Sequence, residues 1–240
     1  MSLRSRLILI ACTLLVAAVC VRLGIWQLHR LAQRRAANAA ALSARSAPIM
    51  LLTRETIATP SIANRRVQAS GHYDHSHDLV LRGREYRGAP GVEIVSPLLL
   101  GDGTPAVLVN RGFLPSPDAF TVHPDSFQEA GPVTVRGIAL PISSGGGAPI
   151  AQGSETTWAR LDLEALRRQL PYAVQPVYIR EFPDSSRRRF PRALDPPALD
   201  DGPHLSYAIQ WFSFGVLTLV FGILILRQSG KGKAQLRLER

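Results

Sequence analysis

The residues best suited to chemistry lie in the last quarter of the sequence, where a long apolar segment begins. A histidine, a tyrosine, a glutamine and a tryptophan enter this segment at His204, Tyr207, Gln210 and Trp211. Polar and ionisable side chains are costly inside a bilayer, so their presence in a membrane helix indicates a function. A neutral imidazole beside aromatic rings suits binding of a flat, metal-containing ligand or contact with another membrane protein.

Helical spacing predicts that these residues share one face. His204, Tyr207, Ala208 and Trp211 fall at i, i+3, i+4 and i+7. Trp211 should lie about 10 Å deeper than His204 along the helix axis, beyond a usual interfacial position. In the alternative interpretation His204 caps the helix and Trp211 belongs to an aromatic belt. We favour a pocket at the outer leaflet, shared by both apolar segments.

The first apolar segment ends with a second group of polar residues. Trp26 and Arg30 fit an interfacial belt, whereas Gly24 allows close helix approach and Gln27 can hydrogen-bond to a partner helix. Arg22 lies deeper. It either extends outward to the head groups or meets a carboxylate, on a haem propionate or on an acidic partner protein.

Two segments have the length and composition of membrane spans. Residues 7–28 and 204–226 are each long enough for a hydrocarbon core of about 30 Å, and only Arg22 is charged in either. The first is predicted to be an uncleaved anchor, because no small-residue cleavage site follows it. In the second, Ala208, Gly215 and Gly222 recur every seven residues and predict a seam on which the first span packs.

Charge predicts the topology. The chain has 28 basic and 18 acidic residues and a net charge of +10, yet residues 31–203 are nearly balanced. The excess surrounds the spans, which indicates orientation rather than nucleic-acid binding. The Arg187-Arg188-Arg189 run in a Pro-rich loop is more typical of a solvated segment. Residues 1–6 and the basic tail 227–240 are predicted to be cytoplasmic, and residues 29–203 to face outward.

Both cysteines, Cys12 and Cys20, lie on the first span. Eight residues of helix separate them by about 12 Å, too far for a disulfide. The outward domain has none, so it is neither disulfide-stapled nor a thiol-based copper carrier.

The segment between the spans is predicted to be mainly β. Residues 31–47 should first continue as a polar helix. Trp158 is then expected to open a short helical piece, residues 162–170, with acids in its first turn and arginines in its last. The predicted strands, separated by Gly and Pro, are residues 66–73, 78–81, 92–100 with a break at Pro97, 106–113, 133–140 and 174–182. The fold class is a membrane protein of the α+β type, with two terminal transmembrane helices flanking a small open barrel or sandwich.

Common catalytic motifs are missing from this domain, which argues against an enzyme. The cluster His72, His75 and His77 allows two interpretations. In an extended strand His75 and His77 would point to one face and could share a metal. A polar hairpin tip is the simpler interpretation, and we favour it. Asn110 to Gly112 are predicted to form a strand end and tight turn, with Arg111 paired to an acid such as Asp162.

These motifs, in this order and with a span at each end, resemble those of the SURF1 family of assembly factors for haem-copper cytochrome c oxidase. The resemblance covers residues 24–214. It rests on Gly24-x-Trp26-Gln27-x-x-Arg30, Gly71-x-Tyr73, Gly91 with Pro97-Leu98, Val109-Asn110-Arg111-Gly112-Phe113-Leu114-Pro115, Trp158-x-x-x-Asp162, and His204-x-x-Tyr207-Ala208-x-Gln210-Trp211-Phe212.

The resemblance implies a multi-pass protein of the bacterial inner membrane with a periplasmic domain. It implies binding of haem a, with His204 as the axial ligand of the iron, and help in placing the haem in the oxidase catalytic subunit. The expected partners are that subunit, the enzymes of haem a biosynthesis and the lipid bilayer. The remaining candidate haem-binding residues are Tyr207, Trp211, Trp26, Gln27, Arg30 and Arg22.

Two other functions remain open. A scaffold could hold oxidase subunits without binding haem, with Trp26, Tyr207 and Trp211 against the partner and His204 dispensable. An outward-facing enzyme or sensor would need a deep polar pocket, around Arg111, Asp162 and the histidine cluster.

Overall fold

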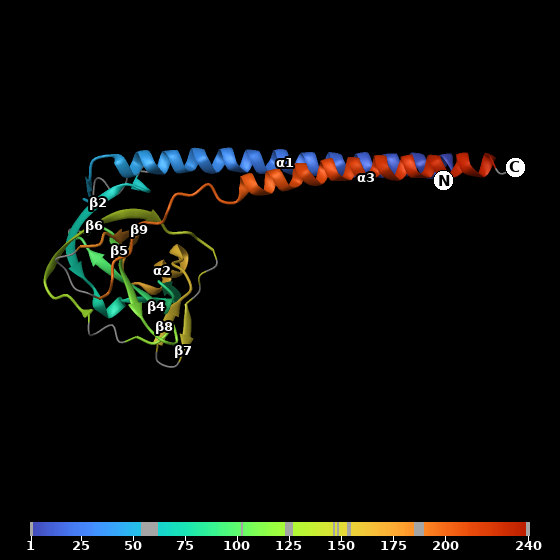
Figure 1. The fold of residues 1–240 in the computed structure, drawn as a ribbon. Coiled ribbons are helices and arrows are strands. Elements are labelled where there is room, and N and C mark those ends of the chain that lie inside the picture. The colour runs from blue at the N-terminus through green and yellow to red at the C-terminus, as the bar shows by residue number, and fades with distance from the viewer. Residues whose placement is uncertain are drawn as a thin grey trace. The chain divides into compact units, whose positions relative to one another are not determined.

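The computed structural model of the chain contains two units (Figure 1), each considered by itself. The first unit comprises residues 1–39 and 199–240, and the second comprises residues 40–198. The structure describes residues 2–53, 62–101, 103–122, 127–145, 147, 149–152, 155–184 and 190–238. The Arg187-Arg188-Arg189 run lies outside the described residues.

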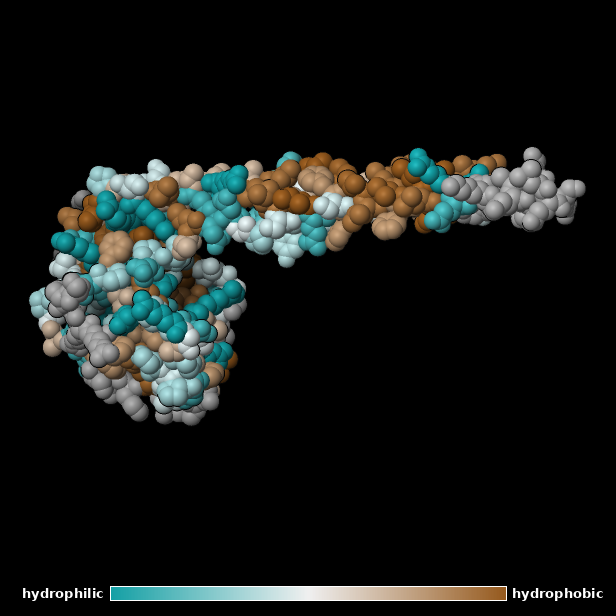
Figure 2. Space-filling view, in the orientation of Figure 1, coloured by the Kyte–Doolittle hydropathy of each residue, from teal (hydrophilic) through white to brown (hydrophobic). Residues whose placement is uncertain are grey.

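The first unit is an antiparallel pair of helices. Helix α1 spans Leu3–Ser46 and helix α3 spans His204–Leu238. Both are long and apolar enough to cross a membrane, and Figure 2 shows the hydrophobic surface that they present. As predicted, α1 continues without a break through the polar stretch that follows its apolar part. The structure therefore has the terminal membrane helices expected from the sequence.

Small residues let the two helices pack closely. A Cβ placed on Gly24 would lie 2.6 Å from the Phe212 ring, and one on Gly222 would lie 2.6 Å from the Thr13 side chain. Ala208 is 1% exposed, and Gly215 packs against Cys20. The predicted seam of Ala208, Gly215 and Gly222 is confirmed. Cys12 and Cys20 are both free thiols.

The second unit is built on a five-stranded barrel. Its strands are hydrogen-bonded in the order β2-β6-β9-β5-β4, and β4 pairs back to β2 at Tyr73↔Leu98 and His72↔Leu99. The strands are β2 (Arg66–Tyr73), β4 (Ala89–Leu99), β5 (Ala106–Pro115), β6 (Pro132–Pro141) and β9 (Val174–Glu181). A Cβ on Gly71 would lie 2.2 Å from the carbonyl oxygen of Leu99, so a glycine is needed where the barrel closes.

Shorter elements extend the sheet and cover its outer face. Strand β3 (Leu79–Tyr86) joins β4, and beyond it lie β8 (Glu155–Trp158) and β7 (Ile150–Gln152), while β1 (Met50–Leu51) joins β2. A small apolar core that includes Val109, Val135 and Ile179 belongs to the barrel strands. A second core centres on Trp158, which is fully buried against β3, β5 and helix α2 (Leu163–Gln169).

Two details of the predicted β domain are wrong. Trp158 ends strand β8, which runs parallel to β3, and does not open a helix. Strand β4 passes through Pro97 without a break. Proline lacks a backbone N–H but keeps its carbonyl, which accepts a hydrogen bond from the Asp74 N–H.

Helix α2 forms where the sequence predicted. Asp162 is its N-cap and accepts a 3.0 Å hydrogen bond from the Ala165 N–H, while Arg167 and Arg168 occupy the last turn. The hydrogen bond from Ala165 and those from neighbouring N–H groups lower the pKa of the Asp162 carboxyl, against the opposing effect of desolvation. Asp162 is thus committed to capping and is not the partner of Arg111.

Candidate functional site

The structure brings together two of the predicted site residues, one from each membrane helix. His204 Nδ1 lies 2.9 Å from Gln27 Oε1. An amide oxygen only accepts hydrogen bonds, so Nδ1 is the donor in this contact, and the neutral form of such an imidazole has its lone pair on Nε2. The contact forms where α3 begins and where the polar part of α1 follows its apolar part. The predicted hydrogen bond between Gln27 and the partner helix is confirmed, with Gln27 as the acceptor.

His204 lies at the edge of a pocket of about 370 Å³ within the helix pair. Its other lining residues are Arg30, Gln33, Arg34, Ala37 and Gly202. Two arginines and an imidazole therefore border one small space. An anionic group could pair with the arginines while a metal ion met the imidazole.

A short polar latch holds the start of α3 against α1. Arg35 forms a 2.8 Å ion pair with Asp201, and the side chains of Arg34 and Asn38 donate hydrogen bonds to the Asp200 carbonyl at 3.1 and 2.7 Å. These contacts fix the turn that precedes His204. Much of the pocket's shape therefore depends on the helical continuation of α1 beyond its apolar part.

The other candidate residues lie farther from this pocket's lining. Trp211 is half-buried and its ring meets Phe214 edge-on at 6.0 Å, deeper in the helix pair. Trp26 and Tyr207 are about half exposed, at 53% and 48%, and Arg22 is also exposed. None of the four is among the described lining residues. The residues of α3 that were predicted to share one face therefore lie in different surroundings. Ala208 is buried in the seam, whereas Tyr207 lies outside it.

Sequence reasoning missed Arg34 as a lining residue. The signal was present, because Arg30 and Arg34 are four residues apart on a segment already predicted to be helical. Gly202 was also missed. It has a φ of +65° in the turn before His204, a conformation that favours glycine.

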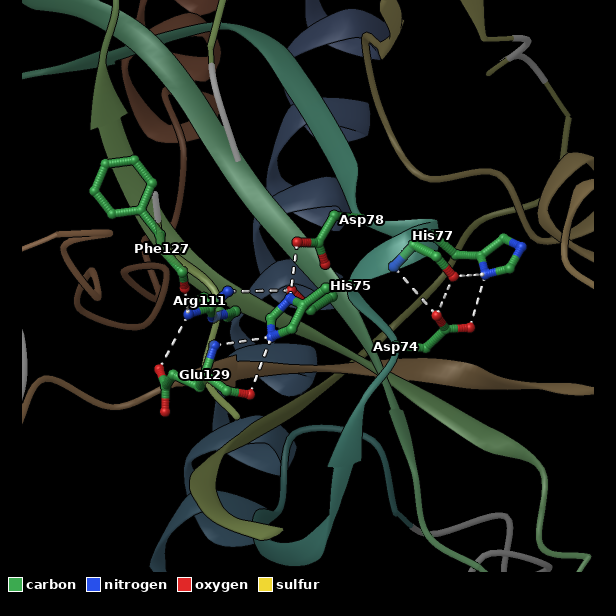
Figure 3. Close-up of polar contacts among 9 residues, drawn as sticks. Asp74, His75, His77, Asp78, Arg111, Phe127 and Glu129 are labelled. Atoms are coloured by element: carbon green, nitrogen blue, oxygen red, sulfur yellow. Dashed lines mark hydrogen bonds and ion pairs between the residues drawn. The ribbon is translucent and has the colours of Figure 1, made fainter. Parts of the chain in front are cut away.

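The histidine cluster of the barrel unit is held by carboxylates (Figure 3). His75 and His77 lie in a short 3-10 helix, His75–His77, and not in an extended strand, so the alternative interpretation in which they share one strand face is wrong. His75 Nδ1 is 3.0 Å from Asp78, and its Nε2 accepts a hydrogen bond from the Glu129 N–H. His72 is exposed on β2. Among the described residues, no group of three ligating side chains could hold a metal ion.

Arg111 sits inside strand β5 at a bulge, not at a strand end. Ile94 pairs with Gly112 and Val95 with Asn110, which leaves Arg111 without an opposite residue on β4. Its side chain is 2% exposed and forms a 3.0 Å ion pair with Glu129. The guanidinium also lies 5.0 Å from the centre of the Tyr73 ring. The acidic partner of Arg111 is therefore Glu129 and not the predicted Asp162.

Arg111 and Glu129 also border a recess of about 1030 Å³ in the barrel unit. Neither Asp162 nor a histidine of the cluster is among its described lining residues. The grouping that an enzyme or sensor was expected to need is therefore only partly present, through the contact of Arg111 and His75 with Glu129.

Replacing Arg111 with methionine should destabilise the barrel unit by about 3 kcal/mol, because the carboxylate of Glu129 and the carbonyl of Phe127 would lose a partly buried cation. Urea unfolding of the full chain in detergent, followed by circular dichroism, measures this. Arg111→Lys keeps the charge and should lose less. Equal stability of wild type and Arg111→Met would contradict this role.

Asp74 gathers several donors beside this network. Its carboxylate accepts hydrogen bonds from Ser76, from His77 at 2.7 Å and from the Tyr172 hydroxyl at 2.8 Å. Burial acts to raise the pKa of Asp74, but these hydrogen bonds outweigh it and leave the pKa below its usual value. Burial, together with the hydrogen bond to Asp74, raises the pKa of the Tyr172 hydroxyl.

Acid should remove the stabilisation that Asp74 provides. Because its pKa is lower in the folded state, this stabilisation is complete above the ordinary carboxyl pKa of about 4 and disappears as the pH falls through the folded-state pKa. We expect the melting temperature of wild type to exceed that of Asp74→Asn at pH 6, and the difference to shrink as the pH falls below the ordinary carboxyl pKa. Thermal melts across this range test the prediction, and a gap that does not depend on pH would contradict it.

Comparison of the sequence with known protein families identifies the family of the chain. A sequence model described as the SURF1 family matches residues 14–216. The chain belongs to the SURF1 family. The matched range includes Gln27, the Arg111 bulge and His204, so the resemblance identified from the motifs is confirmed, and with it a membrane protein with two terminal apolar helices flanking a mainly β domain.

Relatives in the family come from bacteria and eukaryotes. A SURF1-like protein of Monosiga brevicollis is 26% identical over 90% of this chain and 86% of its own length. An uncharacterised SURF1-like protein of Mycobacterium tuberculosis is 28% identical over 70% of this chain and 61% of its own length. Surfeit locus protein 1 of Rattus norvegicus is 25% identical over 85% of this chain and 71% of its own length.

Proposed function

We propose that the chain is an assembly factor for haem-copper cytochrome c oxidase, which binds haem a at the mouth of its helix pair and aids insertion of the haem into the catalytic subunit. Membership of the SURF1 family supports the assembly role. The contact between His204 and Gln27 is the observation that supports haem binding most directly. The proposed role is that of a carrier rather than a catalyst.

The residues at the mouth fit a haem. With Nδ1–H donated to Gln27, His204 presents the lone pair of Nε2, which is the form of histidine that binds iron. Arg30 and Arg34 border the same pocket and offer guanidinium groups to the two carboxylates of a haem. The iron would supply the axial bond, while this chain orients the imidazole and neutralises the carboxylates.

The remaining features of the proposal follow the charge distribution. The basic residues at both ends of the chain favour cytoplasmic termini and a barrel unit in the periplasm of a bacterial inner membrane. This topology would place His204 at the outer leaflet. The proposed partners are the oxidase catalytic subunit and the enzymes that make haem a.

The absorbance spectrum of the full chain, purified in detergent from cells that make haem a, tests the proposal. A haem spectrum at a stoichiometry near one haem per chain is the expected result. His29→Ala provides the control for His204→Ala, because His29 is exposed on α1 and is not among the pocket's described lining residues. A haem-free wild type under the same haem supply would overturn haem binding and leave family membership intact.

Gln27→Leu should weaken haem binding by about 10- to 100-fold, because the imidazole would lose the acceptor that fixes its tautomer and orientation. Gln27→Glu keeps an acceptor and should retain most of the affinity. Titration of the purified apo-protein with haem, followed by absorbance, measures both variants. Equal affinity of Gln27→Leu and wild type would show that Gln27 does not position His204.

A scaffold without haem is the second candidate function. It is favoured by the exposure of Trp26, Tyr207 and Arg22 on the surface of the helix pair, where a partner helix could cover them. In that case substitution of these three residues, and not of His204, would reduce the yield of assembled oxidase in cells.

A further inference from the structure

A second hollow lies deeper in the helix pair. It has a volume of about 400 Å³ and a mostly apolar lining. Leu9 and Thr13 of α1 form one wall, and the other is formed by Phe214, Leu217, Thr218, Phe221, Gly222 and Ile225 of α3. Both threonine hydroxyls bond to carbonyl oxygens four residues earlier in their own helices, so the groove surface keeps the methyl groups and rings.

The groove and the His204 pocket open on the same edge of the helix pair. On α1, Leu9 of the groove and Arg30 of the pocket are separated by three intervals of seven residues. On α3, His204 and Thr218 are separated by two such intervals. The seam repeats with this same spacing, at Gly215 and Gly222, so a seven-residue step returns to the same side of the pair.

Aromatic side chains line the edge between the two hollows. Tyr207 and Trp211 follow His204 at helical spacing, and Trp211 meets Phe214 edge-on at 6.0 Å. Phe214 already belongs to the groove, and ten residues of helix place it about 15 Å deeper than His204. One edge of the pair thus runs from an imidazole and two arginines, past aromatic rings, to an apolar groove.

We propose that this groove receives the long isoprenoid side chain of haem a. The inference rests on the proposed function, and it assigns Phe214, Leu217 and Thr218, the lining residues nearest to His204 along α3, to the selection of haem a over haem b, which lacks that chain. Haem a is polar at one end and apolar at the other, in the same order as this edge of the helix pair. Its iron and carboxylates would meet the polar groups at the mouth, and its tail would lie on the apolar ones. A lipid acyl chain fits the groove alone, but it would not depend on the pocket at the mouth.

Selection inside a bilayer must come from packing, since lipid tails are as apolar as the groove. The tail would gain specific contacts with Phe214, Leu217 and Thr218 at the end of the groove nearer to His204, which lipid chains fill less specifically. We expect wild type in lipid nanodiscs to bind haem a about tenfold more tightly than haem b.

Variants that fill the groove test the inference. Thr218→Phe and Leu217→Trp each fill the end of the groove nearer to His204. Each should reduce the affinity for haem a about tenfold, to the level of haem b, and leave haem b binding unchanged. Val216→Phe is the matched control, because Val216 is 59% exposed outside the groove. Retained binding of haem b shows that each variant is folded.

The outcomes separate the two proposals. Equal affinity of wild type for haem a and haem b would overturn the groove assignment and leave haem binding at His204 intact. Unchanged haem a affinity in both filled variants would assign the groove to lipid acyl chains. A parallel loss of both haems in the filled variants would indicate damage to the helix pair and not tail selection. Binding of neither haem by wild type would overturn the proposed function, and the groove assignment with it.

Discussion

Gly112→Ala should lower the melting temperature of the barrel unit by about 10–15 °C, equivalent to a loss of more than about 4 kcal/mol. A Cβ at this position would lie 2.0 Å from the carbonyl oxygen of Arg192, and the φ of Gly112 is +122°. The clash is with backbone, so no side chain can rotate away. Relief requires the segment around Arg192 to move, which breaks both hydrogen bonds that Phe113 and Arg192 exchange at 2.8 Å.

The matched control for this variant is Gly101→Ala. Gly101 also has a positive φ, of +82°, but nothing lies within 4 Å of a Cβ built there. It should cost only the conformational strain of about 1–2 kcal/mol. Thermal melts of the full chain, followed by the circular dichroism of the sheet, measure both variants. Equal losses would show that strain, and not the approach of Arg192, governs the position.

His204→Ala should abolish haem binding, with an affinity loss above about 100-fold, the upper end of what an outer-shell partner such as Gln27 contributes. The variant removes the group that would bind the iron and also ends the hydrogen bond to Gln27. The helix pair should remain folded, because the seam of Ala208, Gly215 and Gly222 does not involve His204.

Two controls sharpen this result. Free imidazole added to His204→Ala should restore part of the haem spectrum, since it can occupy the vacated ligand position. His29→Ala should bind haem like wild type, because His29 lies on the exposed surface of α1. A His204→Ala protein that keeps both spectrum and affinity would move the iron ligand elsewhere and favour the scaffold.

Local patterns in the sequence predicted most of the elements of the fold. Hydrophobic length identified both membrane helices, and alternation bounded by Gly and Pro located β2, β5 and β6 to within two residues. Asp162 was recognised as the start of a helix because capping is a property of neighbouring residues. The seam of Ala208, Gly215 and Gly222 followed from spacing alone.

Features that depend on the closed barrel could not be predicted in this way. Trp158 was expected to open a helical piece, yet long-range pairing with β3 places it in a strand. The acidic partner of Arg111 depends on a bulge and on a segment 18 residues away, and no local signal specifies either. His75 and His77 lie in a short 3-10 helix rather than in a strand because Asp78 and Asp74 form hydrogen bonds with them.

The contact between Gln27 and His204 also sets how far one membrane helix can slide along the other. The seam below it uses interchangeable small residues spaced seven apart, and a slide of seven residues, about 10 Å, would again match small residues with small residues. A hydrogen bond at one end removes this ambiguity, since only one alignment pairs the amide with the imidazole. The same two side chains, together with the Arg35–Asp201 ion pair, thus mark a single alignment of the two membrane helices.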